Sequence, residues 1–141
     1  MPTISYVIIP IMKTFITMHA LIEYKGKYLI LQRANDRSNP GYWNCVTGHI
    51  KEKENVEETA LREVKEETNL DGEIIKIGEP LIHYNRNQRW IILSYLIKVS
   101  DISNLRIDIR ELQDYKWIEK DSDMVSKYKG FEETLKVLGI L

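Results

Sequence analysis

Three glutamates near the middle of the chain constrain the fold more than any other feature. Glu63, Glu66 and Glu67 follow an i, i+3, i+4 spacing, so a helix places their carboxylates on one side. Like charges at this spacing repel each other and destabilise an isolated helix. A hard divalent cation removes that repulsion, and Mg²⁺ prefers oxygen ligands of this kind. The spacing therefore predicts a helix that carries a metal site.

The position of these glutamates on a helical wheel supports the same interpretation. The apolar stripe of a helix over residues 56–68 consists of Val56, Ala60 and Val64, with Leu61 at its edge. Glu63 and Glu67 lie beside this stripe rather than opposite it, and Glu66 lies further out. Partly buried carboxylates need a cation or a hydrogen-bond partner. On the wheel alone, a metal ion and an ion pair of Glu66 with Arg62 are both open explanations.

The stretch from Gly48 to Leu70 resembles the Nudix box, whose pattern is G-x5-E-x7-R-E-U-x-E-E-x-G-U, with U an apolar residue. Eight of the nine specified positions match. They are Gly48, Glu54, Arg62, Glu63, Val64, Glu66, Glu67 and Leu70. Asn69 stands where the pattern has glycine. Asparagine tolerates the left-handed backbone of a helix end better than most residues, so we expect the geometry of this helix end to be kept.

The resemblance implies one Nudix domain over residues 1–141, an α/β/α sandwich with a mixed β-sheet. It also implies hydrolysis of a diphosphate linked to another group, with Mg²⁺ or Mn²⁺ as cofactor. The implied metal ligands are Glu63, Glu66, Glu67 and the carbonyl of Gly48. The implied catalytic residues are Glu63, Glu66 and Arg62, of which Arg62 pairs with Glu54 to brace the loop.

A general base is also needed, and Glu111 is the candidate outside the box. It lies shortly before a strand expected over residues 114–118. In several members of the family an acid at this place ligates a metal or activates water. A box glutamate in that role, with Glu111 as an ordinary solvated carboxylate, is the alternative.

Two short matches bear on the substrate. The segment Y-W-N-C-V-T-G over residues 42–48 looks like the W-x-x-V-T-G entry of the dihydroneopterin triphosphate pyrophosphatase branch. The segment E-L-Q-D-Y-K-W over residues 111–117 resembles a later stretch of that branch. The resemblance implies cleavage of a nucleoside or pterin triphosphate to a monophosphate and pyrophosphate. ADP-ribose, nucleotide sugars and dinucleoside polyphosphates stay open as substrates.

Rival activities on the same fold are less consistent with the residues. A non-catalytic nucleotide sensor usually loses box glutamates, and all are present here. An isopentenyl diphosphate isomerase uses a catalytic cysteine, and nothing around Cys45 supports that role. Cys45 lies in an apolar stretch, which predicts a buried core residue, and a single cysteine fits a reducing cytoplasm. The three histidines have no ligand spacing, so we expect no zinc site.

Substrate contacts are predicted at three positions outside the box. Arg33 ends a strand that leads toward the box, where a guanidinium would contact phosphate. Tyr84 and Arg86 flank a hairpin turn and would stack on a base. An ordinary surface role for Arg33 and ordinary strand packing at the hairpin are the alternatives.

The charge balance limits the class of partner. The 141 residues carry a formal net charge of -1, which gives no bulk attraction to nucleic acid or acidic membranes. We therefore expect a small phosphorylated molecule as substrate, held by a local cation. Residues 6–12 are apolar but short and interrupted by Pro10, which argues against a signal peptide or membrane span. We interpret residues 1–12 as an edge strand or a packing arm, of the kind that makes a subunit contact in a homodimer.

Hydrophobic periodicity and turn residues give the expected order of elements. Strands are expected over residues 14–24, 27–33, 43–46, 73–77, 81–84, 89–99 and 114–118. Helices are expected over residues 56–68 and 131–138, and residues 101–111 form a connection. Strands on both sides of a central helix favour a mixed sheet covered by helices on two faces.

Overall fold

The longest strand, β1 (Lys13–Tyr24), organises the sheet of this computed structural model, which describes residues 11–141. On one side β1 pairs in parallel with β7 (Gln88–Lys98) along nearly its whole length. On the other side it pairs antiparallel with β4 (Val46–His49) and, only at its end, with β2 (Lys27–Arg33). β1 and β2 therefore diverge after their tight turn, and β4 pairs with β1 where β2 no longer does.

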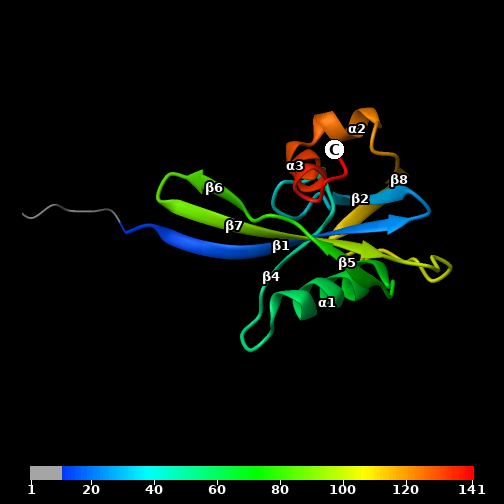
Figure 1. Cartoon of the computed structure of the whole chain (residues 1–141), viewed down its shortest axis with the longest axis horizontal. Coiled ribbons are helices and arrows are strands. Elements are labelled where there is room, and N and C mark those ends of the chain that lie inside the picture. The colour runs from blue at the N-terminus through cyan, green and yellow to red at the C-terminus, as the bar shows by residue number, and fades with distance from the viewer. Residues whose placement is uncertain (1–10) are drawn as a thin grey trace, which may run out of the picture.

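Four further strands complete a mixed sheet of eight. β3 (Trp43–Asn44) and β8 (Leu112–Ile118) pair with β2, while β5 (Glu73–Ile77) and β6 (Leu81–Asn85) pair with β7. Helix α1 (Val56–Thr68) covers one face, and α2 (Asp123–Lys127) and α3 (Lys129–Val137) cover the other (Figure 1). This is the α/β/α arrangement that the resemblance implies.

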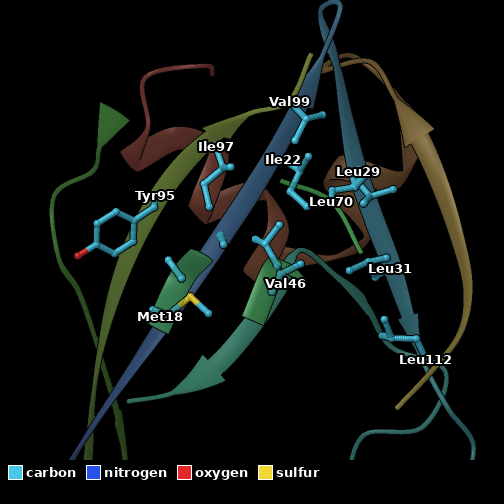
Figure 2. Packing of buried hydrophobic residues seen from close by; sticks show 13 residues of the cluster. Met18, Ile22, Leu29, Leu31, Val46, Leu70, Tyr95, Ile97, Val99 and Leu112 are labelled. Atoms are coloured by element: carbon cyan, nitrogen blue, oxygen red, sulfur yellow. The ribbon is translucent and has the colours of Figure 1, made fainter. Parts of the chain in front are cut away.

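Two hydrophobic clusters, one on each face of the sheet, hold the layers together. Side chains of a strand alternate between faces, so Ile22 packs in the cluster that includes Val64 of α1, whereas Leu21 packs with Phe131 and Leu135 of α3. Figure 2 shows the first cluster, in which β1, β2 and β4 contribute neighbouring aliphatic side chains. Burying α1 against this cluster fixes which side of the helix meets solvent, and therefore fixes the direction of its glutamates.

The observed elements agree with most of the expected ones. The predicted bounds of α1 are confirmed, and Asn55 caps the helix by accepting a hydrogen bond from the Glu58 amide at 2.8 Å. Asn69 ends it with φ 60°, so the expected left-handed geometry is also confirmed. The strand expected over residues 43–46 is two strands, β3 and β4, because the Cys45 amide donates to the Asn44 side chain instead of a strand.

Helix α2, on the face of the sheet opposite α1, was not expected from the sequence. The five-residue α2 is too short to show a periodic pattern, and its visible signal is the cap at Ser122. The predicted arm over residues 1–12 lies mostly outside the described residues. Its last two residues, Ile11 and Met12, belong to no strand and are exposed. Among the helices of residues 11–141, none has the length and apolar character needed to cross a membrane.

Candidate active site

Helix α1 presents its glutamates in a gradient of burial. Glu67 is 5% exposed, whereas the Glu63 and Glu66 side chains are 15% and 51% exposed. This order follows from the helical wheel, since Glu67 lies one turn beyond Glu63 beside the apolar stripe and Glu66 points further out. The prediction that two of the three carboxylates lie at the edge of the core is therefore confirmed as geometry.

Arg62 joins the loop before the helix to the helix itself. Its Nε donates to Glu54 Oε2 at 2.7 Å, and its second guanidinium nitrogen donates to Glu54 Oε1 at 3.0 Å. The remaining nitrogen donates to Glu63 at 3.0 Å and to Glu66 at 3.1 Å. The hydrogen bonds from Arg62, with a further one from Thr59, lower the pKa of Glu54 to about 2. The expected Glu54–Arg62 brace is present, and so is the Arg62–Glu66 ion pair.

Gly48 makes room for Glu63. A methyl group built on the Gly48 Cα would lie 2.7 Å from Glu63 Cγ and 2.8 Å from Glu63 Cδ, so no larger residue fits without moving that glutamate. The Gly48 carbonyl accepts a hydrogen bond from the Thr17 hydroxyl at 2.8 Å, which fixes its direction. A carbonyl oxygen has two lone pairs and can accept from two partners.

Glu67 is the electrostatically unusual residue of the site. Its Oε2 is buried and has no hydrogen-bond partner among the described residues. Burial raises the pKa of Glu67 well above its ordinary value, and the neighbouring carboxyl groups of Glu111 and Glu63 raise it further. Arg33 acts in the opposite direction. Burial also raises the pKa of Glu63, against the opposing effect of Arg62. Carboxylates that face one another in this way favour a shared proton or a shared cation.

The donor atoms of this cluster fit a hard divalent cation. Every candidate ligand is an oxygen, from the three carboxylates and the Gly48 carbonyl, which is the donor set of Mg²⁺ or Mn²⁺. The buried, unpartnered Oε2 of Glu67 is the atom that gains most from such an ion. Within residues 11–141, no three His, Cys, Asp or Glu side chains are already arranged to hold a metal. Glu63 and Glu66 instead turn toward Arg62, and metal binding requires them to exchange that partner.

Cationic side chains surround the carboxylates. A cavity of about 360 Å³ is lined by Glu63, Glu67 and Glu111 together with Arg33, Arg37 and Lys51. Glu66 lines an adjoining cavity that also contains Arg37, Glu67 and Glu111. Acidic and basic groups that share one concave surface can bind a metal ion and phosphates next to each other.

The pairing of β2 with β8 explains how residues far apart in the sequence come together at this cavity. β2 and β8 pair antiparallel so that Arg33 lies opposite Leu112, and this brings Arg33 close to Glu111. Arg37, in the loop after β2, donates to Glu111 at 3.1 Å. The structure thus brings Arg33 and Glu111, both sequence-predicted, to the box carboxylates. Arg37 and Lys51 were missed, because a basic residue in a loop carries no sequence signal that distinguishes it from ordinary surface charge.

Two predicted substrate contacts are not among the residues that line these cavities. Tyr84 lies on β6 with 63% of its surface exposed, and Arg86 forms the turn between β6 and β7. Both are at the tip of a hairpin that extends away from the helices (Figure 1). Trp90 of the same hairpin stacks on Phe15 at 4.6 Å, which agrees with strand packing.

Two of the remaining reactive side chains, Cys45 and His19, are buried, and two, His49 and His83, are exposed. Cys45 is buried, as expected, and burial raises the pKa of its thiol. His19 is also buried, bonded to the Thr134 hydroxyl at 2.9 Å, and burial lowers its pKa to about 4. His49 is exposed at the edge of the carboxylate cavity, and His83 bonds to Glu133 at 2.7 Å.

Comparison with known proteins agrees with this site. An RNA pyrophosphohydrolase of Wolbachia pipientis subsp. Culex pipiens is 27% identical over 130 residues, which cover 80% of this chain and 78% of the relative. The dihydroneopterin triphosphate diphosphatase of Escherichia coli K12 is 37% identical over 70 residues, which cover 50% of this chain and 43% of that enzyme. These two relatives act on different phosphorylated compounds, so they support a hydrolase without fixing its substrate.

Structural similarity extends over most of the chain. The MutT NUDIX hydrolase from Burkholderia pseudomallei superposes with a TM-score of 0.72 at 18% identity, covering 89% of this chain and 98% of that structure. The sequence model of the NUDIX domain matches residues 13–131, from the first residue of β1 into α3. The chain therefore belongs to the Nudix family of hydrolases.

Proposed function

We propose that this protein is a Mg²⁺-dependent pyrophosphohydrolase that cleaves a nucleoside or pterin triphosphate to a monophosphate and pyrophosphate. The observation that carries the proposal is the buried, unpartnered Oε2 of Glu67, which faces Glu63 and Glu111 in a cavity rimmed by arginine and lysine. Such a group has no structural benefit, because burying an unpaired carboxylate oxygen costs stability. A divalent cation bound there would supply the missing partner.

Glu63, Glu66, Glu67 and the Gly48 carbonyl would hold the ion. A bound Mg²⁺ would neutralise charge on the phosphates and lower the pKa of a nucleophilic water. Arg33, Arg37 and Lys51 line the same cavity, where they would orient the phosphate chain. Arg62 keeps its two bonds to Glu54 throughout and holds the loop against the helix while Glu63 and Glu66 exchange partners.

Glu111 is the proposed general base. It lies beside Glu67 and is the more exposed of the two, with 37% of its side chain accessible, so a water can reach it. In the proposed reaction Glu111 takes a proton from the attacking water. The new bond forms to the α-phosphorus, the bond between that phosphorus and the bridging oxygen breaks, and pyrophosphate leaves with the electron pair. Arg37 donates a hydrogen bond to Glu111 at 3.1 Å, and both side chains line the cavity.

The substrate class rests on the W-x-x-V-T-G and E-L-Q-D-Y-K-W segments and on the partial match to the E. coli enzyme. ADP-ribose, nucleotide sugars and dinucleoside polyphosphates are the alternative small-molecule substrates. The Wolbachia relative makes 5′-triphosphorylated RNA a necessary comparison. A nucleotide sensor without activity is the alternative of another class.

The test is a screen of about fifty phosphorylated metabolites and one 5′-triphosphate RNA with Mg²⁺, in which mass spectrometry identifies both products. Glu66→Gln should abolish turnover, because it removes a ligand charge, yet it leaves an amide that still accepts from Arg62. Glu57→Gln, on the exposed first turn of the same helix, is the matched control and should retain activity. Tight nucleotide binding with no turnover of any compound would instead support the sensor.

A further inference from the structure

The connection that leads to Glu111 is fastened to the end of helix α1. Carbonyl groups in the last turn of a helix have no partner within that helix. Here the Glu67 carbonyl accepts from the Asp108 amide at 2.9 Å, and the Thr68 carbonyl accepts from the Arg106 amide at 3.0 Å. The backbone of Asp108 is therefore tied directly to Glu67, the most deeply buried of the three box glutamates.

Asp108 also closes the turn that carries Glu111. Its carbonyl accepts from the Glu111 amide at 3.1 Å and from the Leu112 amide at 2.9 Å. Its side chain accepts from the Arg110 amide at 3.1 Å. This is an Asx turn, in which an aspartate side chain bonds the backbone two residues further on. Three consecutive amides, those of residues 110–112, thus donate to the same aspartate.

Hydrogen bonds, more than packing, give this turn its shape. Ile109 at the tip of the turn is 82% exposed, so it adds little to the core. Leu112 is buried in the hydrophobic cluster that includes Val64 of α1, and it anchors the far end. The Arg110 guanidinium donates to the two oxygens of Asp108 at 2.9 and 3.0 Å, which fixes the direction of that carboxylate. Between the two anchored ends, the place of Glu111 depends on the acceptors of Asp108.

We infer that Asp108 is a positioning residue, which holds the proposed base Glu111 at a fixed place beside Glu67. The link consists of two backbone hydrogen bonds, one from the Asp108 amide to Glu67 and one from the Glu111 amide to Asp108. A general base must come within about 2.6–3.2 Å of the water that it deprotonates, so metal ligand and base must keep a fixed separation. The inference rests on the proposed function, in which Glu67 holds the ion and Glu111 takes the proton.

The test measures kcat and KM for pyrophosphate release from dihydroneopterin triphosphate and from GTP at saturating Mg²⁺. Asp108→Ala removes the acceptor for the Arg110 amide. It should lower kcat by about 100-fold with little change in KM, the effect of misplacing a catalytic group by about 1 Å. Asp108→Asn keeps an oxygen for that amide and should recover most of the loss. Asp108→Ser makes the same turn more weakly, so its kcat should lie below that of Asp108→Asn even if Asp108→Ala fails to fold.

Asp101→Ala provides the matched control. The Asp101 side chain accepts from the Ser103 amide at 2.8 Å, so it forms the same kind of turn in the same connection. Asp101 is exposed and lines neither cavity of the site. The control substitution should leave kcat unchanged.

A double variant separates positioning from a general loss of folded protein. Glu111→Gln should lower kcat by about 100- to 10,000-fold, the usual contribution of a general base. Because Asp108 acts through Glu111, adding Asp108→Ala should cause no further loss, whereas a folding defect would lower activity in both backgrounds. The increase in Tm with Mg²⁺ should be the same in Asp108→Ala and the wild type, because the proposed metal ligands lie on α1 and at Gly48.

Full kcat in Asp108→Ala, an equal loss in Asp108→Asn, or a further loss in the double variant would overturn the inference while leaving the proposed hydrolase intact. A crystal structure of Asp108→Ala tests the geometry without turnover. It should show α1 unchanged and the Glu111 carboxylate displaced from Arg37, and an unmoved Glu111 would overturn the inference. A displaced Glu111 in a protein that cleaves neither compound would support the positioning role and contradict the proposed function.

Discussion

Replacing Gly48 with alanine should disable the site with little effect on the fold. The added methyl group would lie 2.7 Å from Glu63 Cγ and 3.0 Å from its Oε1, whereas carbon atoms in contact are normally about 3.5–4.0 Å apart. Glu63 must therefore move by about 1 Å. The backbone of Gly48 is not in the left-handed region, so alanine adds no strain of its own. A flexible side chain absorbs the shift at a cost of about 1 kcal/mol.

Catalysis is far more sensitive to the same displacement. A misplacement of about 1 Å can lower a rate by about 100-fold, so kcat/KM for pyrophosphate release should fall by that order at saturating Mg²⁺. Thermal unfolding should show a small decrease in Tm. Because the change acts through Glu63, the double variant with Glu63→Gln should be no less active than Glu63→Gln alone. Full activity in Gly48→Ala, or a further loss in the double variant, would refute the reasoning.

Three further predictions concern stability. The buried His19 has a pKa of about 4, against 6.5 in an unfolded chain. As pH falls, the unfolded state therefore binds the proton first. The free energy of unfolding should decrease by about 3 kcal/mol between pH 7.5 and pH 4. Urea unfolding should show a smaller decrease in the free energy of unfolding for His19→Gln over the same pH range. The same pH dependence in the variant and the wild type would count against a neutral buried His19. In the absence of Mg²⁺, Glu67→Gln should raise Tm, because it removes a buried carboxylate. It should also eliminate the increase in Tm that Mg²⁺ gives the wild type. Equal stabilisation of both proteins by Mg²⁺ would contradict the role of Glu67 as a metal ligand. Asn69→Ala should lower the free energy of unfolding by about 1 kcal/mol, because alanine is strained in the left-handed backbone of this position. Asn69→Gly should be nearly neutral, because the relief of backbone strain offsets the lost hydrogen bond to the Asn104 carbonyl. Equal Tm values for the two variants would contradict this account.

Local patterns predicted the central helix well. The i, i+3, i+4 spacing, the cap at Asn55 and the end at Asn69 involve neighbours in sequence, so they are visible before any fold is known. The helical wheel also predicted that Glu67 lies nearer the core than Glu66, because the apolar stripe alone decides that order.

Contacts between distant segments were harder to predict. The position of Glu111 beside Glu67 depends on the register of β8 against β2, which places Leu112 opposite Arg33. The split of the strand at Cys45 depends on one side-chain hydrogen bond from its amide to Asn44. No periodic pattern encodes either feature.

The hairpin shows the limit of residue-type arguments. Aromatic and basic residues around a turn are compatible with base stacking, and Tyr84 and Arg86 fit that description. The parallel pairing of β1 with β7 carries the hairpin tip away from the carboxylates, so these residues do not line the cavities of the site. Arg37 shows the reverse case, since an unremarkable loop arginine reaches Glu111 at 3.1 Å.

The most direct test of the metal site is a crystal structure grown with Mn²⁺ and a non-hydrolysable triphosphate, with anomalous diffraction to locate the ion. The account predicts an anomalous peak about 2.2 Å from carboxylate oxygens that include Glu67 Oε2, with Glu63 and Glu66 turned away from Arg62. A bound triphosphate with no peak in this cavity, and with Arg62 still bonded to both glutamates, would contradict it.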